Sequence, residues 1–224
     1  MNPVCYYYKI IITRMTSDKQ TDFSDSAAVI VAYVFHPLLM PVYGMAIIFS
    51  APTLFGYLPF NVKKILLLIM LVNNVLLPLS MLPFFMQRKI ITSWTISERK
   101  ERNIPLIITS LLYCTTSYIV FRFPIPVFLK SFIFATAFIS IIITIINFWW
   151  KISLHAVGSG ALIGLVLILS FKMITPLEWY LISAIIAGAS VLSSRLRLNL
   201  HTPPQVWMGL FTGFFGLTLF MILF

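Results

Sequence analysis

Two histidines and two arginines stand at or near the ends of apolar stretches between residues 102 and 201. His155 and His201 can divide the roles of nucleophile and general acid between them. Arg102 and Arg195 can stabilise the oxygens of a transferring phosphoryl group through bidentate hydrogen bonds. Ser153 begins an apolar stretch, and the exposed N–H groups at the start of a helix favour an anion. Together these residue types indicate metal-independent phosphoryl transfer through a histidine.

The composition places these residues in a membrane protein. Of the 224 residues, 60% are hydrophobic and only 10% are charged, whereas about 25% of a soluble domain is charged. Sixteen Lys and Arg residues oppose six acidic ones, which gives a net charge of +10. The basic residues lie in short gaps between apolar stretches, so we expect no nucleic-acid partner. Anionic lipid headgroups or a phosphate-bearing substrate at the membrane surface fit this pattern better.

The apolar stretches predict seven transmembrane helices, because about 20 apolar residues span a bilayer. The stretches are 27–51, 64–86, 105–122, 126–148, 153–171, 177–193 and 205–224. Pro37, Pro41 and Pro78 lie within them and predict kinks. We therefore expect an all-α fold, a polytopic integral membrane helical bundle of about seven transmembrane helices.

Seven crossings place alternate gaps on the same face of the membrane. By this count, residues 97–105, 151–155 and 194–201 meet on one face, together with the N-terminal tail. These stretches carry the histidines and arginines considered above, so we expect one site. Eleven of the sixteen basic residues lie on that face, but five of the eleven are candidates for phosphate binding. The positive-inside rule therefore leaves the orientation undecided.

The positions of the acidic residues and cysteines narrow the chemistry. No acidic residue lies in the middle of an apolar stretch, since Glu178 stands at the very start of 177–193. Coupled transport needs ionisable groups at membrane depth, so a secondary transporter is disfavoured. Only Glu98 and Glu101 stand near the candidate site, so we expect no metal site and no cofactor. Cys5 and Cys114 are far apart and indicate no disulfide framework.

The spacing around His201 resembles the third signature of the type 2 phosphatidic acid phosphatases, the PAP2 superfamily. That signature reads Ser-Arg, five residues, His, three residues, Asp. This chain has Ser194, Arg195 and His201 at the same spacing, with Gln205 in place of the aspartate.

The two other PAP2 signatures are present in part and in the family's order. The second, Pro-Ser-Gly-His, is matched by Ser153 and His155. The first, Lys, six residues, Arg-Pro, is matched only by Arg102, since Pro105 comes three residues later and Thr95 stands in place of the lysine. Two predicted spans separate each signature from the next.

The resemblance, carried by residues 87–224, implies a PAP2-like six-helix core with an additional N-terminal span. It divides the chain into a tail (1–26), two N-terminal transmembrane helices (27–86) and a catalytic-type core (87–224). It implies a lipid or polyprenyl phosphate as substrate, membrane lipids as neighbours and a location in the bacterial inner membrane. The alternative it leaves is a catalytically inactive relative that binds lipid phosphate, or a subunit of a membrane-protein complex or homo-oligomer.

The resemblance also implies a role for each site residue. His201 would attack phosphorus and form a phosphohistidine, and His155 would protonate the leaving oxygen. The phosphate-binding residues would be Arg102, Arg195 and Ser153 with its backbone N–H, with Arg99 or Lys100 replacing the missing lysine.

Gln205 has two possible roles, one as the partner of His201 and one as a helix cap. In the family the aspartate orients the nucleophilic histidine and stabilises its cation, whereas Gln205 carries no charge. Alternatively, Thr202, Pro203 and Gln205 have the spacing of a helix N-cap, a first-turn proline and the distal residue of a capping box.

Simpler interpretations apply to several other polar positions. Arg197 is typical of an interfacial anchor, and residues 97–103 are equally consistent with a solvated turn. His36 lies within the first span, which favours a buried, hydrogen-bonded histidine. The Asn73–Asn74 pair in the second span predicts a hydrogen bond to a neighbouring helix. The small residues of 158–164 predict a close approach of two helices.

Overall fold

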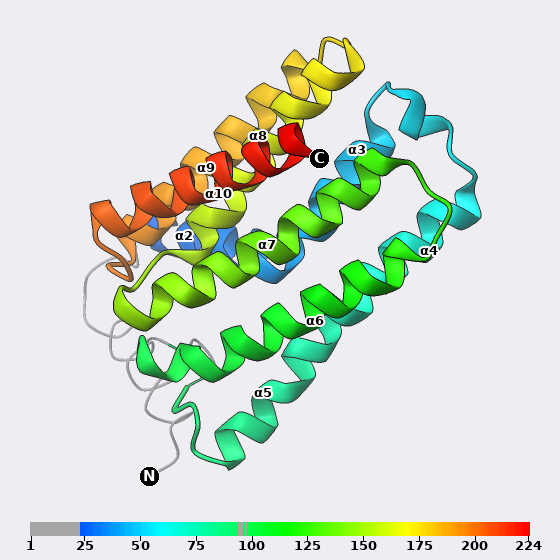
Figure 1. Cartoon of the computed structure of the whole chain (residues 1–224). Helices are drawn as coiled ribbons and strands as arrows, with labels where there is room; N and C mark the ends of the chain where they lie inside the picture. Colours follow the sequence, from blue (N-terminus) through cyan, green and yellow to red (C-terminus); the bar gives the residue numbers. More distant parts are fainter. Residues whose placement is uncertain (1–22, 94–95, 97) are drawn as a thin grey trace.

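A computed structural model describes residues 23–93, 96 and 98–224, and every regular element within them is helical (Figure 1). The elements are α2 (Phe23–Val34), the 3₁₀ turn η1 (Pro37–Leu39), α3 (Met40–Ser50), the 3₁₀ turn η2 (Leu54–Tyr57), α4 (Phe60–Leu71), the π-helical turn η3 (Val72–Leu76), α5 (Leu77–Gln87), the 3₁₀ turn η4 (Lys100–Arg102), α6 (Asn103–Phe121), α7 (Val127–Trp149), α8 (Leu154–Met173), α9 (Glu178–Arg197) and α10 (Pro203–Leu223). Cys5 and Thr95 lie outside the described residues.

Seven helical segments of the described chain are long and apolar enough to cross a membrane, which confirms the predicted membrane bundle. They are Asp25–Ser50, Phe60–Gln87, Lys100–Phe121, Val127–Trp149, Leu154–Met173, Glu178–Arg197 and Pro203–Leu223. The largest difference from the predicted ranges is in the third segment, which begins at Lys100 instead of residue 105. Several candidate site residues therefore lie within the ends of helices.

The first two spans are interrupted, as their prolines predict. In the first, α2 ends before Pro37, which lacks an N–H group, and His36 caps the turn η1. In the second, η3 precedes Pro78 in the first turn of α5. Within η3, the Oδ1 of Asn74 accepts a 2.7 Å hydrogen bond from the Thr116 hydroxyl of α6. This bond confirms the predicted contact of the asparagine pair with a neighbouring helix.

Glycines allow the backbones of α8 and α10 to touch. A Cβ on Gly160 would lie 2.0 Å from the Leu210 carbonyl oxygen, and one on Gly213 would lie 1.9 Å from the carbonyl oxygen of Val157. These distances leave room for hydrogen alone, and they confirm the close approach predicted for 158–164. Gly209 meets the backbone of residue 153 in the same way, so the contact extends to the start of α8.

Buried hydroxyl groups join α6 to α7. The Ser110 hydroxyl lies 2.9 Å from that of Ser140 and 2.8 Å from that of Thr144, and the Thr144 hydroxyl also donates to the Leu106 carbonyl. Hydrogen bonds between buried hydroxyls fix the two helices side by side. The start of α6, which carries Arg102, is thereby held beside the end of α7.

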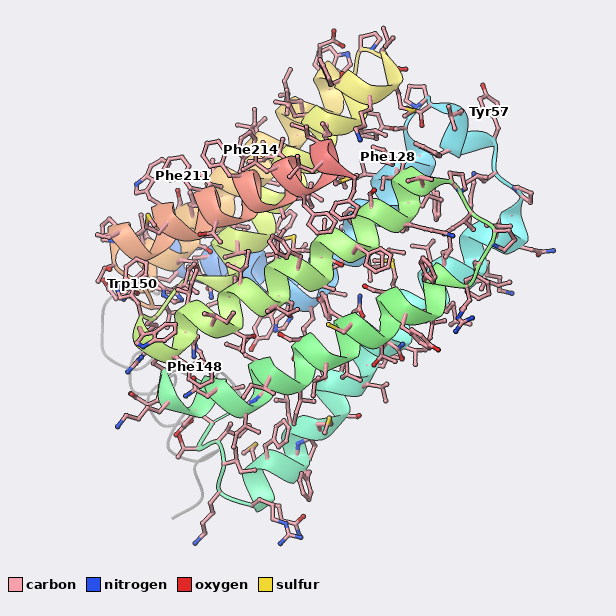
Figure 2. All side chains as sticks on the ribbon, in the orientation of Figure 1. Tyr57, Phe128, Phe148, Trp150, Phe211 and Phe214 are labelled. Atoms are coloured by element: carbon pink, nitrogen blue, oxygen red, sulfur yellow. The ribbon has the colours of Figure 1, made fainter. Side chains whose placement is uncertain are left out.

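One end of the bundle gathers the starts of α2, α8 and α10 and the ends of α7 and α9 (Figure 1). The Ser153 N–H donates to the Gln205 carbonyl at 3.3 Å, and the Arg99 guanidinium donates to carbonyl oxygens at the end of α7. These contacts confirm that the three polar stretches converge on one face. Figure 2 shows Trp150 at this end and Tyr57 at the other, as expected for the two interfaces of a membrane.

Candidate functional site

His201 and Gln205 form the best-defined part of the site, between the end of α9 and the first turn of α10. The Nδ1 atom of His201 lies 3.0 Å from Oε1 of Gln205, and the backbone N–H of Thr202 donates to the same Oε1 at 3.3 Å. An N–H group can donate only to the amide oxygen, so this end of the glutamine is its acceptor. Nδ1 of His201 must therefore carry the proton, and Nε2 has a free lone pair.

Gln205 thus serves both functions considered from the sequence. With Thr202 it completes the capping box at the start of α10. The same oxygen also binds the imidazole of His201. A carbonyl oxygen has two lone pairs, so one amide group accepts both bonds. Helix capping and orientation of the histidine are therefore compatible.

Three cations lie near enough to His201 to act on its charge. Burial lowers the pKa of His201 to about 4, the Gln205 hydrogen bond opposes this, and the charges of Arg102, Lys151 and Arg195 lower the pKa further. Burial and Arg102 also lower the pKa of Lys151, partly offset by Glu98. At neutral pH the His201 imidazole is therefore uncharged, which is the form that can act as a nucleophile.

An open depression of about 570 Å³ gives access to this histidine. Its lining residues are Lys151, Leu196, Asn199, Leu200, His201, Thr202, Pro203 and Gln205. It combines a cation, an imidazole, two amides and a hydroxyl with three apolar side chains.

Arg195, in the last turn of α9, is buried close to both catalytic candidates. Its side chain is 6% exposed and its Nε lies 3.5 Å from the Ser194 hydroxyl. It interacts electrostatically with His155, His201 and Arg102. Within residues 23–93, 96 and 98–224, no carboxylate forms an ion pair with it. A buried cation without a counter-ion is costly, so this position favours an anionic ligand.

His155 lies in the first turn of α8, and the charge of Arg195 acts on it. Its Nε2 donates to the Ala32 carbonyl oxygen of α2 at 3.2 Å, because a carbonyl can only accept. The ring interacts electrostatically with His201 as well as with Arg195. The two histidines predicted to share the chemistry therefore lie in one electrostatic environment.

His36 is a neighbour of the site that the sequence analysis did not include. The predicted hydrogen bond is present, since its Nδ1 accepts from the Leu38 N–H at 3.4 Å. However, its ring also packs edge-to-face on His155, with ring centroids 5.9 Å apart. The signal available in the sequence was Pro37, which breaks the first span at this residue and brings it to the site.

The cations near the start of α6 divide into different environments. The Nε of Arg102 donates to the Ile96 carbonyl at 2.8 Å, and its charge acts on His201 and Lys151. Arg99 instead binds the carbonyl oxygens at the end of α7, and Asn147 donates back to the carbonyl of Arg99 at 3.1 Å. Arg99 is thereby a helix cap. Lys100 is exposed to solvent.

Ser153 makes contacts within the protein, and its role in phosphate binding stays a prediction. It is fully buried, its hydroxyl accepts from the Ala156 N–H of α8 at 3.5 Å, and its own N–H donates to the Gln205 carbonyl. That N–H therefore has a partner within the protein. The close contact between α8 and α10 brings the backbone carbonyl of Gln205 to the N–H group that the resemblance assigned to phosphate.

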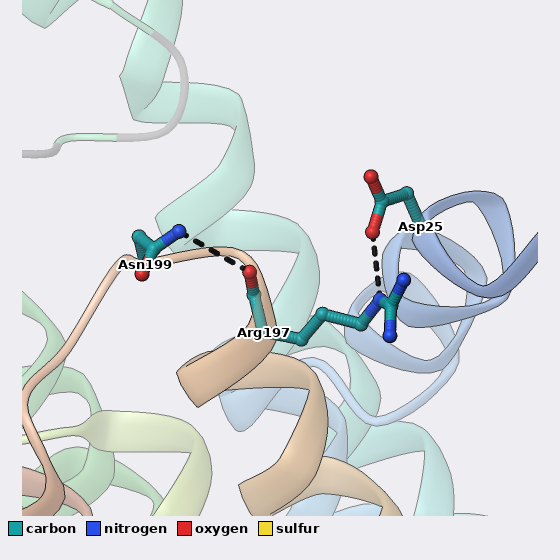
Figure 3. A network of polar contacts seen from close by, with 3 residues as sticks. All are labelled: Asp25, Arg197 and Asn199. Atoms are coloured by element: carbon teal, nitrogen blue, oxygen red, sulfur yellow. Dashed lines mark hydrogen bonds and ion pairs between the residues drawn. The ribbon is translucent and has the colours of Figure 1, made fainter. Parts of the chain in front are cut away.

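Arg197 lies outside this cluster and forms an ion pair with Asp25 of α2, with its Nε 2.7 Å from the carboxylate (Figure 3). The Asn199 side chain donates to the Arg197 carbonyl at 3.5 Å. The pair connects α9 to α2 at the same end of the bundle. Of the two arginines at the end of α9, only Arg195 belongs to the site.

Comparison with protein-family models, curated proteins and solved structures finds no match for this chain. The chemistry of the site therefore has to be argued from its own geometry. Among the described residues, no three His, Cys, Asp or Glu side chains are grouped to hold a metal ion. The described site is a depression that contains His201 and Lys151, and the charges of Arg102 and Arg195 act on His201 there. This arrangement suits a phosphate-like anion.

Proposed function

We propose that this integral membrane protein is a metal-independent phosphatase or phosphotransferase that acts on lipid or polyprenyl phosphates through a phosphohistidine. The observation that carries the proposal is the Gln205 oxygen shared between the Thr202 N–H and His201 Nδ1. It leaves Nε2 of His201 unprotonated beside the charges of Arg102 and Arg195.

In the first step, the Nε2 lone pair of His201 attacks phosphorus while the bond from phosphorus to the leaving oxygen breaks. His155 is neutral in the free protein, with its Nε2–H on the Ala32 carbonyl, and takes a second proton on Nδ1 from the monoanionic phosphate of the substrate. It gives this proton to the leaving oxygen, so the alcohol or phosphate leaves in protonated form. Arg102 and Arg195 bind the phosphoryl oxygens as charge develops on them. The product is a phosphohistidine, and His155 is left neutral.

In the second step, a water molecule attacks phosphorus and the bond to His201 Nε2 breaks. His155 now accepts the proton of that water on Nδ1 and passes it to the departing phosphate, which returns the imidazole to its neutral form. Inorganic phosphate leaves, and His201 regains its free lone pair. An alcohol in place of water would make the same reaction a phosphotransfer.

The position of the site favours a lipid substrate. The pocket lies at one end of seven helices that are long and apolar enough to cross a membrane. A phosphate at headgroup level can reach this end while its acyl or prenyl tail stays among the helices' lipid neighbours. We place the protein in the bacterial inner membrane as part of this proposal.

Phosphate release from a panel of lipid phosphates tests the proposal. The purified protein is incubated with phosphatidate, phosphatidylglycerophosphate, a prenyl diphosphate and lipid A, with and without EDTA. We expect release from at least one substrate, unchanged by EDTA and abolished in His201→Ala. Absence of release from every substrate would contradict an enzymatic function.

The second candidate is a catalytically inactive protein that binds lipid phosphate or serves in a membrane complex. Two observations favour it: Gln205 is uncharged, and Arg99, a candidate for the first signature's missing lysine, caps α7. It predicts phosphate-dependent lipid binding that is weakened in Arg195→Ala, without phosphate release or a phosphohistidine. Vanadate, which mimics pentavalent phosphorus, would bind in both cases, so turnover decides between them.

A further inference from the structure

The break in the first span brings a backbone carbonyl to the site. In a continuous helix the N–H of His36 would donate to the carbonyl of Ala32, four residues earlier. Here α2 ends at Val34 and Pro37 cannot continue it. The Ala32 carbonyl accepts from Nε2 of His155 instead, at 3.2 Å. A side chain of α8 thereby takes the place of a helical donor at the end of α2.

The ring of His36 makes a second contact with the same imidazole. The two rings lie edge-to-face, with centroids 5.9 Å apart and planes at 76°. His36 is itself held in place, because its backbone is extended, Pro37 follows it and its Nδ1 accepts from the Leu38 N–H. Edge-to-face ring pairs have a preferred geometry, so a fixed ring constrains its neighbour.

Arg195 joins these two rings to the rest of the site. Its charge acts on both His36 and His155. The cluster therefore draws on three separate parts of the chain: the end of the first half-span, the first turn of α8 and the last turn of α9.

We propose that His36 is a positioning residue for His155. Its ring and the Ala32 carbonyl hold the His155 imidazole in the orientation from which it passes a proton to the leaving oxygen. This inference rests on the proposed function, and it extends the site into the N-terminal span, outside residues 87–224. His36 acts only through His155, and a displaced catalytic group lowers the rate steeply.

Two substitutions separate the ring contact from the helix cap. His36→Asn removes the ring but keeps an acceptor for the Leu38 N–H, since asparagine is a favourable N-cap. His36→Phe keeps an aromatic ring against His155 but removes the acceptor. We expect His36→Phe to retain turnover and His36→Asn to lose it.

The leaving group then distinguishes proton transfer from general destabilisation. On a lipid phosphate, whose alkoxide must be protonated, we expect kcat of His36→Asn to fall about tenfold or more with KM unchanged. On p-nitrophenyl phosphate, whose leaving group needs no proton, the rate of the first-turnover burst of p-nitrophenol, which precedes the attack by water, should match the wild type in both variants. Full turnover of the lipid by His36→Asn, or equal losses on both substrates, would overturn the proposal.

Nitrogen-15 spectra of the histidines provide a readout that does not require turnover. The chain has three histidines, so single substitutions assign the signals in a lipid nanodisc. We expect His155 to show the single Nε2–H tautomer in the wild type and in His36→Phe, and mixed tautomers in His36→Asn. An unchanged tautomer in His36→Asn would overturn the positioning role. If the wild type hydrolyses neither ester, the proposed function fails, and the spectra still decide the role of His36.

Discussion

The α8–α10 contact and the segment before α6 bring polar groups to the same end of the bundle but use them differently. At the α8–α10 contact, backbone proximity fixes the helix starts, and His201 keeps an unprotonated Nε2. Before α6, Arg99 and Arg102 donate to backbone carbonyls. The two regions therefore differ in what their polar side chains do. The imidazole of His201 has a free lone pair, whereas Arg99 stabilises the end of α7 and Arg102 combines a backbone contact with a charge that acts on His201.

The largest effect is expected from a methyl group in the α8–α10 contact. In Gly213→Ala the new Cβ would lie 1.9 Å from the Val157 carbonyl oxygen, so the helices must separate. We expect a loss of about 3 kcal/mol, the upper part of the range for overpacking, and a Tm lower by roughly 10 °C in detergent. Gly216→Ala is the control, since its Cβ would meet only the Ile139 side chain, at 3.3 Å. Equal unfolding temperatures for the two variants would refute the importance of the contact.

Replacing Gln205 tests whether its oxygen orients the nucleophile. Gln205→Ala removes both hydrogen bonds, and we expect kcat to fall roughly 100-fold, the lower end of what acid–base groups contribute. Gln205→Glu keeps the capping box and adds a charge that stabilises the cationic form of His201, so kcat should rise. Phosphate release from the same lipid measures both. Unchanged kcat in Gln205→Ala would reduce Gln205 to a helix cap.

The lowered pKa of His201 leads to a prediction about how stability depends on pH. Because its pKa is about 4 instead of 6.5, the folded protein binds fewer protons than the unfolded chain between these values. Stability from this residue is therefore complete above about pH 6.5 and is lost as the pH falls toward 4. Unfolding temperatures from pH 7 to pH 4 should decline less in His201→Asn than in the wild type. The same decline in both would contradict the buried, neutral imidazole.

Arginine substitutions compare the two cations before α6. Arg102→Ala should raise KM about tenfold, since its charge acts at the site. Arg99→Ala should leave KM unchanged and lower stability by about 1 kcal/mol, because it loses hydrogen bonds at the end of α7. Steady-state kinetics and thermal unfolding of both variants check the assignment. A raised KM in Arg99→Ala would return this residue to the phosphate-binding set.

The smallest effect is expected at the Arg197–Asp25 pair. Both side chains are largely exposed, at 43% and 58%, and exposed pairs contribute little. Arg197→Ala should change the free energy of unfolding by less than about 1 kcal/mol and leave kcat unchanged. A large loss of activity would mean that the second arginine of α9 also serves the site.

Much of the fold and part of the site could be predicted from the sequence. Apolar length predicted the seven spans, and the alternation of sides predicted that His155, His201 and the arginines meet. Both predictions need only the apolar pattern of each stretch and the number of membrane crossings. The buried Ser153 N–H could not be predicted, since its partner is a carbonyl 52 residues later in the chain, brought close by glycine contacts.

The role of single cations was also beyond sequence reasoning. Arg99 and Arg102 have the same charge and nearly the same position in the sequence. Only their contacts in the folded chain show that Arg99 binds the end of α7 and that Arg102 acts on His201. The sequence likewise places His36 in the first span but does not predict its contact with His155. The two residues are far apart in the sequence, and no local pattern indicates that their rings meet.

Trapping the phosphorylated enzyme tests the central claim most directly. The protein is mixed briefly with a lipid carrying ³²P-phosphate, quenched in alkali and digested to locate the label. The account predicts an acid-labile phosphoryl group on Nε2 of His201, absent in His201→Ala and more persistent when His155 is replaced. Turnover without any phosphohistidine, or a label that survives in His201→Ala, would contradict it.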